Sequence, residues 1–557
     1  MEDKMKIKKI ITLLIAAIMV FTLGACGKTS NSNAGEKEAN SESNNDTAKA
    51  IHINLPESWK FESFYTIITP ANSSSGYGIT YYLTSFYDTL VQYDENGKLT
   101  GSLAEKWSVS EDGKVYTFNI RKGIKFSDGS DLTAEDVAKS LKASPVNLGQ
   151  YNGSYGKLST IIQDVKATDD HTVELYLTQP YYSTLRDLCL ANPFGIVSGE
   201  QLNDDLTVKG SFSTATYGTG PYMYQGDGDG QTYNFVKNPY YWGEAPQVDS
   251  FSIKVLADND AKILALKNGE IDFISGISKI SSESYEEMKN SGSFGAKADD
   301  NATQTYYIGY NLSDTVFGDK TVREAISMAI DKQNIVDNIY GGLYEKADTF
   351  FSKVLPYCDV EQTVYDFDLD KAKALLDKAG YKDNDGDGIR EKNGSKMAAD
   401  FLYQTGSASD DNMVVYICDQ LKKIGIQLTP KSAPMMDWYA MITGGKYGLT
   451  VFKTQGGYYD PSNVISNIDP AMSMDPIMSQ ISGFLPGKAQ LISEVNSATD
   501  EKRIQDIYNT ILTAMADNCL NTPIYYTHQV VLYNDKIADY EFTRDANFTA
   551  IQNIKRR

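Results

Sequence analysis

Acidic side chains that could bind a cation gather in one short stretch. Asp383, Asp385 and Asp387 stand at alternate positions, and Gly386 permits the sharp turn that a cation loop needs. Carboxylates spaced in this way can converge on a hard cation such as Ca²⁺. The twelfth position of such a loop carries a bidentate Glu in calcium-binding proteins, and here it is Gly394. We therefore favour an acidic hairpin turn and keep a weak calcium site as the alternative.

No residues have the spacing of a known catalytic site. The sequence contains no HExxH, GxSxG, P-loop or CxxC motif. Its three histidines, His52, His171 and His528, are far apart along the chain. His171 follows two aspartates in an expected turn, so a solvated loop residue is favoured over a ligand. We predict neither an enzyme nor a cofactor, although a carboxylate dyad would leave no local signature.

Four of the five cysteines follow the N-terminal region. Outside the cell they could form two disulfides. Their spacing fits no known disulfide framework, and cysteine often behaves as a small buried hydrophobe. Free thiols are therefore predicted, with disulfides as the alternative, at Cys189, Cys358, Cys418 and Cys519.

The fifth cysteine, Cys26, ends a targeting segment. A lysine-rich start precedes an apolar run at 10–21 that is too short for a confident spanning helix. The tetrapeptide Leu-Gly-Ala-Cys at 23–26 resembles a lipobox, whose cysteine takes two acyl chains and becomes the mature N-terminus. We predict a signal peptide at 1–25 and a lipid anchor at Cys26, on the extracytoplasmic face of the cell membrane. A plain signal peptide is the alternative.

Composition narrows the range of partners. Residues 26–50 are rich in Ser, Asn, Glu and Lys, which predicts a disordered tether behind the lipidated cysteine. The 557 residues carry a formal net charge of −21, which argues against nucleic acid as a partner. Tyrosine is abundant, with 38 residues, and suits adaptable binding clefts. Most of these tyrosines are nevertheless expected in the core.

A strand, a turn and a capped helix are predicted in close succession. Residues 116–120 alternate between apolar and polar, which indicates a half-buried strand. The Asp128-Gly129 pair turns the chain after a second short strand. Thr133 can cap a helix, and Asp136 three residues later completes a capping box.

The order and spelling of these pieces resemble a family signature. That signature reads L-A-E-x-W, then D-G-x-x-Y-T-F-x-I-R-x-G-x-x-F-x-D-G, then L-T-A-E-D-V, and residues 103–137 match nearly every position. Further matches stand at 218–222, 238–243, 266–272 and 522–526. The chain thus resembles the peptide/nickel family of extracellular solute-binding proteins over nearly its whole mature length.

The resemblance implies a two-lobed α/β fold of the type II periplasmic-binding-protein kind. Its sheets are mixed, and its first lobe is discontinuous and carries an extra subdomain. The two lobes are expected to meet at a hinge of two crossing strands, near Thr305–Asn311 and Asn521–Tyr526. The implied boundaries are lobe I at 51–305 with a subdomain at about 96–200, lobe II at 306–521, and a return to lobe I at 522–557.

The resemblance also points to ligand contacts. In the di- and oligopeptide binders an Asp three residues before a D/E-P pair holds the peptide ammonium, and here that position is Gly457. In the nickel branch the stretch reads T-x-G-x-P-Y-D-P-H-S, which Thr454 and Tyr459 match, but the metal-binding His is Ser462. Of that branch's two arginines, one falls near Lys142, which keeps a positive charge, and the other near Gly195, which keeps none. The candidate ligand-binding residues are Trp438, Tyr458, Tyr459, Thr454, Gly457 and Lys142, with Tyr82 and Tyr155 weaker.

The implied function is that of the substrate-binding lipoprotein of an ABC importer. Short peptides or peptide-like solutes would be buried between the lobes by hinge bending and presented to a membrane permease. A nickel or metal-chelate binding protein of the same family is the alternative. A peptide-sensing receptor without transport and a secreted hydrolase are alternatives of other classes. A monomer is expected.

Overall fold

The structure is a computed structural model, in which residues 50–557 form one unit. The residues it describes are 50–69, 78–94, 97–153, 155–226, 228–276, 278–454, 461–470, 473, 475–495, 497–544 and 548–557. The predicted signal peptide, the lipidation of Cys26 and the tether up to residue 49 lie outside them, as do Gly457, Tyr458 and Tyr459. No helix in the described residues is long and apolar enough to cross a membrane.

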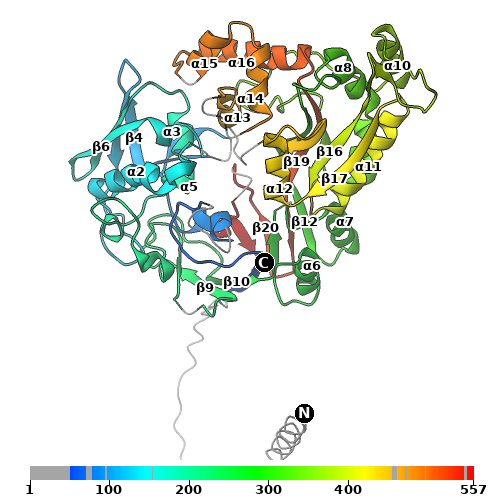
Figure 1. Ribbon diagram of the computed structural model, residues 1–557. Coiled ribbons are helices and arrows are strands. Elements are labelled where there is room, and N and C mark those ends of the chain that lie inside the picture. The colour runs from blue at the N-terminus through cyan, green and yellow to red at the C-terminus, as the bar shows by residue number, and fades with distance from the viewer. Residues whose placement is uncertain are drawn as a thin grey trace, which may run out of the picture. The chain divides into compact units, whose positions relative to one another are not determined.

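Three sheets of four or more strands organise the described part of the chain (Figure 1). The first has the order β1 (His52–Glu57), β10 (Ser250–Val255), β9 (Thr232–Lys237), β8 (Tyr222–Tyr224). The second has the order β4 (Ala104–Val109), β5 (Val115–Ile120), β7 (Thr172–Leu177), β6 (Ile162–Asp169). The third has the order β11 (Phe273–Ser275), β19 (Asn521–Tyr533), β12 (Gly295–Tyr310), β18 (Leu449–Lys453), β16 (Ala398–Gln404), β17 (Gln427–Ala433), with β13 (Glu345–Lys346) also on β19. Parallel and antiparallel pairs occur together in the first and third sheets, so the fold is mixed α/β.

The second sheet and helix α2 (Ala134–Leu148) carry the predicted strand and cap. Tyr116, Phe118 and Ile120 of β5 are buried, and the residues between them are half-buried. Thr133 and Asp136 form the predicted capping box at the start of α2. The second short strand was wrong: around the turn only a single bridge forms, between Lys125 and Asp131. Strand β4, which pairs with β5, was not predicted.

Strands β12 and β19 lie side by side as an antiparallel pair, which confirms both predicted strands. Their register pairs Thr305 with Tyr526 and Gly309 with Asn521. Because side chains alternate across a sheet, Ile308 packs in one core and Tyr307 in another. Helices α8 (Lys320–Ala329), α10 (Leu369–Lys378) and α11 (Ala408–Lys422) cover the face that carries Ile308, toward the right of Figure 1. The other face is covered by α12 (Met435–Thr443), α13 (Ser462–Ser466), α14 (Met478–Ile481), α15 (Lys488–Val495) and α16 (Glu501–Asp517).

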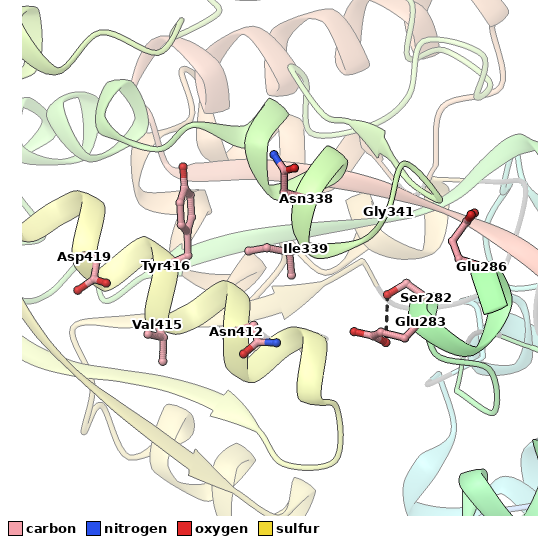
Figure 2. Close-up of a pocket in the computed structure, with 10 residues that line it drawn as sticks. All are labelled: Ser282, Glu283, Glu286, Asn338, Ile339, Gly341, Asn412, Val415, Tyr416 and Asp419. Atoms are coloured by element: carbon pink, nitrogen blue, oxygen red, sulfur yellow. Dashed lines mark hydrogen bonds between the residues drawn. The ribbon is translucent and has the colours of Figure 1, made fainter.

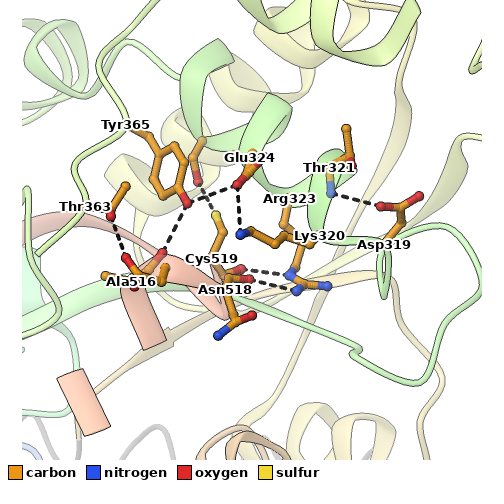
Figure 3. A network of polar contacts seen from close by, with 12 residues as sticks. Asp319, Lys320, Thr321, Arg323, Glu324, Thr363, Tyr365, Ala516, Asn518 and Cys519 are labelled. Carbon is orange, nitrogen blue, oxygen red and sulfur yellow. Dashed lines mark hydrogen bonds and ion pairs between the residues drawn. The ribbon is translucent and has the colours of Figure 1, made fainter. Parts of the chain in front are cut away.

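A buried arginine ties α8 to the start of β19 (Figure 3). Arg323 is 1% exposed, and its Nε donates to the Cys519 carbonyl at 2.7 Å. Its two terminal nitrogens donate to the carbonyls of Gly318 at 2.6 Å and Asn518 at 2.8 Å. Asn518 caps the end of α16, so one guanidinium binds the two carbonyls that directly follow this helix and holds the chain just before β19 begins.

Other local predictions are also confirmed. Val322 and Ile326 share the buried face of α8. Gly269 has the left-handed φ of 73° expected of a residue that ends a helix, here α6 (Asn259–Lys267), before β11. Among the described residues, Cys189, Cys358, Cys418 and Cys519 are free, as predicted.

Candidate functional site

Thr454, within the predicted ligand-side stretch, is bonded to strand β12. Thr454 directly follows β18 and is buried, and its backbone N–H donates to the Thr305 carbonyl at 3.0 Å. The Thr305 N–H donates in turn to Thr454 Oγ1, also at 3.0 Å. The hydroxyl oxygen of Thr454 therefore holds the strand, while its hydrogen can still be donated to a solute.

The stretch ends at a contact with a distant part of the chain. Ser462 begins α13, and its Oγ lies 2.9 Å from Ser183 Oγ. Ser183 directly precedes helix α4 (Thr184–Asp187), which follows the β4–β7 sheet. Both serines are buried. Residues 455–460, which lie between these two contacts along the chain, are outside the described residues.

Trp438 packs in the core beside this stretch. Its indole stacks on Phe452 at a centroid distance of 5.2 Å, and its Nε1–H donates to Thr450 Oγ1 at 3.1 Å. It is 9% exposed. The polar edge of the indole is therefore already occupied, which leaves part of the ring face for contact with a solute.

A carboxylate that sequence reasoning missed lies in the same core. Asp475 Oδ1 accepts from the N–H groups of Ile477 at 2.8 Å and Met478 at 2.9 Å. Its Oδ2 is buried and accepts no hydrogen bond from any described residue, and burial raises the pKa of Asp475 to about 6. The hydroxyl of Tyr307 is likewise buried without a partner among the described residues. The pair Asp475-Pro476 is typical of a helix start, but the sequence gives no sign that the Asp475 side chain is buried.

The three remaining candidates make their described bonds within the first part of the chain. Lys142 Nζ pairs with Asp164 at 3.0 Å, across from α2 to β6. The Tyr155 hydroxyl donates to the Ile68 carbonyl at 2.9 Å, and the buried Tyr82 hydroxyl lies 3.4 Å from a backbone carbonyl. Within the described residues, none of these bonds joins them to Trp438 or Thr454.

A separate hollow of about 590 Å³ lies on the α11 side of the third sheet (Figure 2). It is formed by α7 (Ser282–Ser291), the π-helix η5 (Ile335–Ile339) and α11. Glu283, Glu286 and Asp419 give it an acidic lining, which attracts cations. Of the predicted ligand-binding residues that the structure describes, none lines it.

The acidic turn at 383–388 is closed by a lysine. Asp383 accepts from the N–H groups of Gly386 at 2.7 Å and Gly388 at 2.9 Å. Lys396 pairs with Asp385 at 2.8 Å and also with Asp387. The carboxyl oxygens that approach within 4.8 Å of one another belong to Asp383, Asp385 and Glu391, so Asp387 is not in this group. Lys396 already supplies positive charge to two of the three predicted ligands.

The sequence of this chain is similar to those of known solute-binding proteins. Residues 98–472 match the model of the bacterial extracellular solute-binding proteins, family 5. The nickel-binding periplasmic protein of Escherichia coli (strain K12) is 28% identical over 84% of this chain and 89% of its own. The oligopeptide-binding protein AppA of Bacillus subtilis (strain 168) is 25% identical over 97% of both chains.

Among solved structures, NikA from Brucella suis in complex with Fe(III)-EDTA superposes with a TM-score of 0.82 at 25% identity. The match covers 91% of this chain and 100% of that one. A likeness over the whole of a two-lobed protein confirms the predicted two-lobed, mixed α/β fold.

Proposed function

This chain belongs to family 5 of the bacterial extracellular solute-binding proteins, and we propose that it captures short peptides or peptide-like solutes for an ABC importer. The observation that carries the proposal is the placement of the ligand-side stretch. Within it, Thr454 is bonded to Thr305 of β12, and Ser462, which ends it, is bonded to Ser183. A solute held by this stretch would lie where the two lobes meet, and closure would bury it.

Relatives named for oligopeptides and for nickel suggest two classes of solute for this chain. AppA of B. subtilis is named for oligopeptides, and its likeness spans nearly the full length of this chain. A nickel or metal-chelate solute is the second candidate, favoured by the high TM-score to NikA. We place peptides first because the position of the metal-binding His is Ser462, whose hydroxyl is engaged with Ser183.

The solute contacts are proposed from the residues that flank and form the stretch. Thr454 would donate its hydroxyl hydrogen, and Trp438 would offer part of its ring face. The weaker candidates would act only if the lobe arrangement brings them to the solute. The proposed contacts are Trp438, Tyr458, Tyr459, Thr454, Gly457 and Lys142, with Tyr82 and Tyr155 weaker.

The proposal extends to organisation and location. Lobe I would comprise 51–305 and 522–557, lobe II would comprise 306–521, and the chain would act as a monomer. A diacylated Cys26 and the tether up to residue 50 would hold it at the outer face of the cell membrane, beside the permease. A peptide-sensing receptor is the second class of function, and a solute that binds without being imported would favour it.

Native mass spectrometry of protein purified without refolding tests the solute class directly. A retained mass of a few amino acids is expected, and a mass shifted by Ni²⁺ would favour the chelate alternative. Thermal shift against a peptide library, with and without Ni²⁺, provides the second readout. Tyr459→Ala should weaken the response, and Tyr240→Ala, at an exposed tyrosine of the first lobe, should not. No retained mass and no thermal response would refute the proposal.

A further inference from the structure

A short segment after the second sheet touches residues far along the chain. The hydroxyl of Tyr182 lies 3.0 Å from the hydroxyl of Tyr508 on α16. Next to it, Ser183 Oγ lies 2.9 Å from Ser462 Oγ on α13. These pairs join residues that are 326 and 279 positions apart. The segment therefore contacts α13 and α16, which pack on the Tyr307 face of the third sheet.

An arginine of the same segment adds a third contact. Arg186 Nη2 donates to the Tyr357 hydroxyl at 3.2 Å, and its guanidinium lies 5.0 Å from the centroid of that ring. The Tyr357 hydroxyl donates onward to Glu501 Oε2 at 2.7 Å. Arg186, Tyr357 and Glu501 are thus joined by successive cation–π and hydrogen-bond contacts.

Both sides of the contact are held firmly by their own neighbours. On the first side, Thr184 Oγ1 donates to the Tyr181 carbonyl at 2.7 Å, and Tyr181 is buried in the core of the second sheet. On the second side, Tyr357 has a φ of 63°, which a tyrosine rarely adopts. Gln505 donates to the Tyr357 carbonyl at 3.1 Å, and the Tyr357 ring lies 5.2 Å from that of Tyr508. Such a backbone conformation persists only where the surroundings fix it.

The chemistry of the contact suits a joint that opens and closes. It consists of hydroxyl pairs, a guanidinium and aromatic edges, and these groups can exchange their bonds for bonds to water at little net cost. A contact of purely apolar side chains would lose far more on opening. The three contacts also flank the predicted ligand-side stretch, since Ser462 ends it.

We propose that Tyr182, Ser183 and Arg186 form a latch that holds the two lobes closed against Tyr508, Ser462 and Tyr357. The inference rests on the two-lobed capture proposed above. The latch contributes free energy to the closed state alone, so it sets how long a captured solute stays enclosed. Removing one hydrogen bond of this kind should lower the ratio of closed to open molecules about three- to tenfold.

A cysteine pair measures the closed population. In Ser183→Cys/Ser462→Cys the two sulfur atoms replace oxygens that lie 2.9 Å apart, so a disulfide can form in the closed state with little movement. The full chain is treated with diamide, and the 183–462 disulfide is quantified over time by peptide mapping. Mapping separates this disulfide from any bond made by the five native cysteines. Absence of the 183–462 disulfide would overturn the proposal.

Latch variants are then compared in the same cysteine background. Arg186→Ala and Tyr357→Phe should each slow disulfide formation about three- to tenfold, and Arg186→Lys should restore part of the rate. Lys166→Met is the matched control, because Lys166 makes a similar cation–π contact with Tyr176, 4.8 Å away, within the second sheet. Thermal unfolding checks that each variant folds. Equal rates in the Arg186, Tyr357 and Lys166 variants would overturn the latch.

A second arm separates the latch from the proposed function. The measurement is repeated with trialanine as the probe. If trialanine and the peptide library do not bind but the latch variants still slow the reaction, the function fails and the latch stands. If peptides bind and the variants change nothing, the function stands and the latch fails.

Discussion

Replacing Arg323 by methionine should destabilise the protein through the start of β19. The guanidinium donates to the carbonyls of Cys519, Gly318 and Asn518, and it is fully buried (Figure 3). Hydrogen bonds from charged groups contribute about 1.5–3 kcal/mol each, but burying the charge opposes part of that gain. Methionine fills similar space yet leaves three carbonyls without donors. We expect a net loss of about 3–5 kcal/mol.

This loss converts into a measurable shift in melting temperature. The entropy of unfolding is about 2.1 cal/mol/K per residue, so a cooperative unit of about 500 residues loses about 1 kcal/mol per degree. Differential scanning calorimetry should therefore show a fall of about 3–5 °C. Arg323→Lys should recover only part of it, because an ammonium cannot match the planar fork.

A surface arginine on α16 provides the control. Arg503 pairs with Glu494, and both side chains are partly exposed. Such pairs contribute about 0–1 kcal/mol, so Arg503→Met should shift the melting temperature by about 1 °C or less. The reasoning is refuted if Arg323→Met and Arg503→Met behave alike, since the carbonyls at the end of α16 would then not depend on the guanidinium.

Three further predictions test two buried carboxylates and one helix cap. Lys279→Met should cost about 3–5 kcal/mol of stability because it leaves the buried Glu57, 2.6 Å from Lys279 Nζ, without its counter-charge. A Glu57→Gln/Lys279→Met double variant should recover part of that loss. Calorimetry of both single variants and the double variant checks this, and additive losses would contradict it. Burial raises the pKa of Asp475 to about 6, so the wild type gains stability as pH falls from about 7 to 4, and Asp475→Asn should lack this gain. Melting curves at pH 7.5 and 4.5 check it, and an unchanged difference between the two proteins would count against it. Thr133→Ala should lose about 1 kcal/mol with its capping box, and Thr168→Ala, at an exposed position of β6, should not, as urea unfolding can show.

The sequence predicts those elements whose cause lies within a few residues. The capping box of Thr133 and Asp136 needs only a spacing of three. The left-handed Gly269 needs only the helix that precedes it. The alternation in β5 depends only on which side chains avoid water. Such patterns are local, so they survive whatever the rest of the chain does.

Structural features that depend on residues far away in the sequence could not be predicted from local patterns. Strand β4 has the burial pattern of an exposed edge, and its pairing with β5 decides its structure. The resemblance to the family proposes Trp438 and Tyr82 as ligand contacts, and in the structure both are buried with their polar atoms near protein acceptors. Tyrosine and tryptophan serve cores and clefts equally well, so type alone does not separate the two roles.

The position of Ser462 bears on both proposals made above. In the nickel branch that this stretch resembles, an imidazole there can bind the metal. Here a small hydroxyl occupies the position and lies 2.9 Å from Ser183 Oγ. An imidazole would not fit against that serine without displacing it. The residue that stands where the metal-binding imidazole is expected is thus also one of the proposed latch residues, so solute class and latch are best tested together.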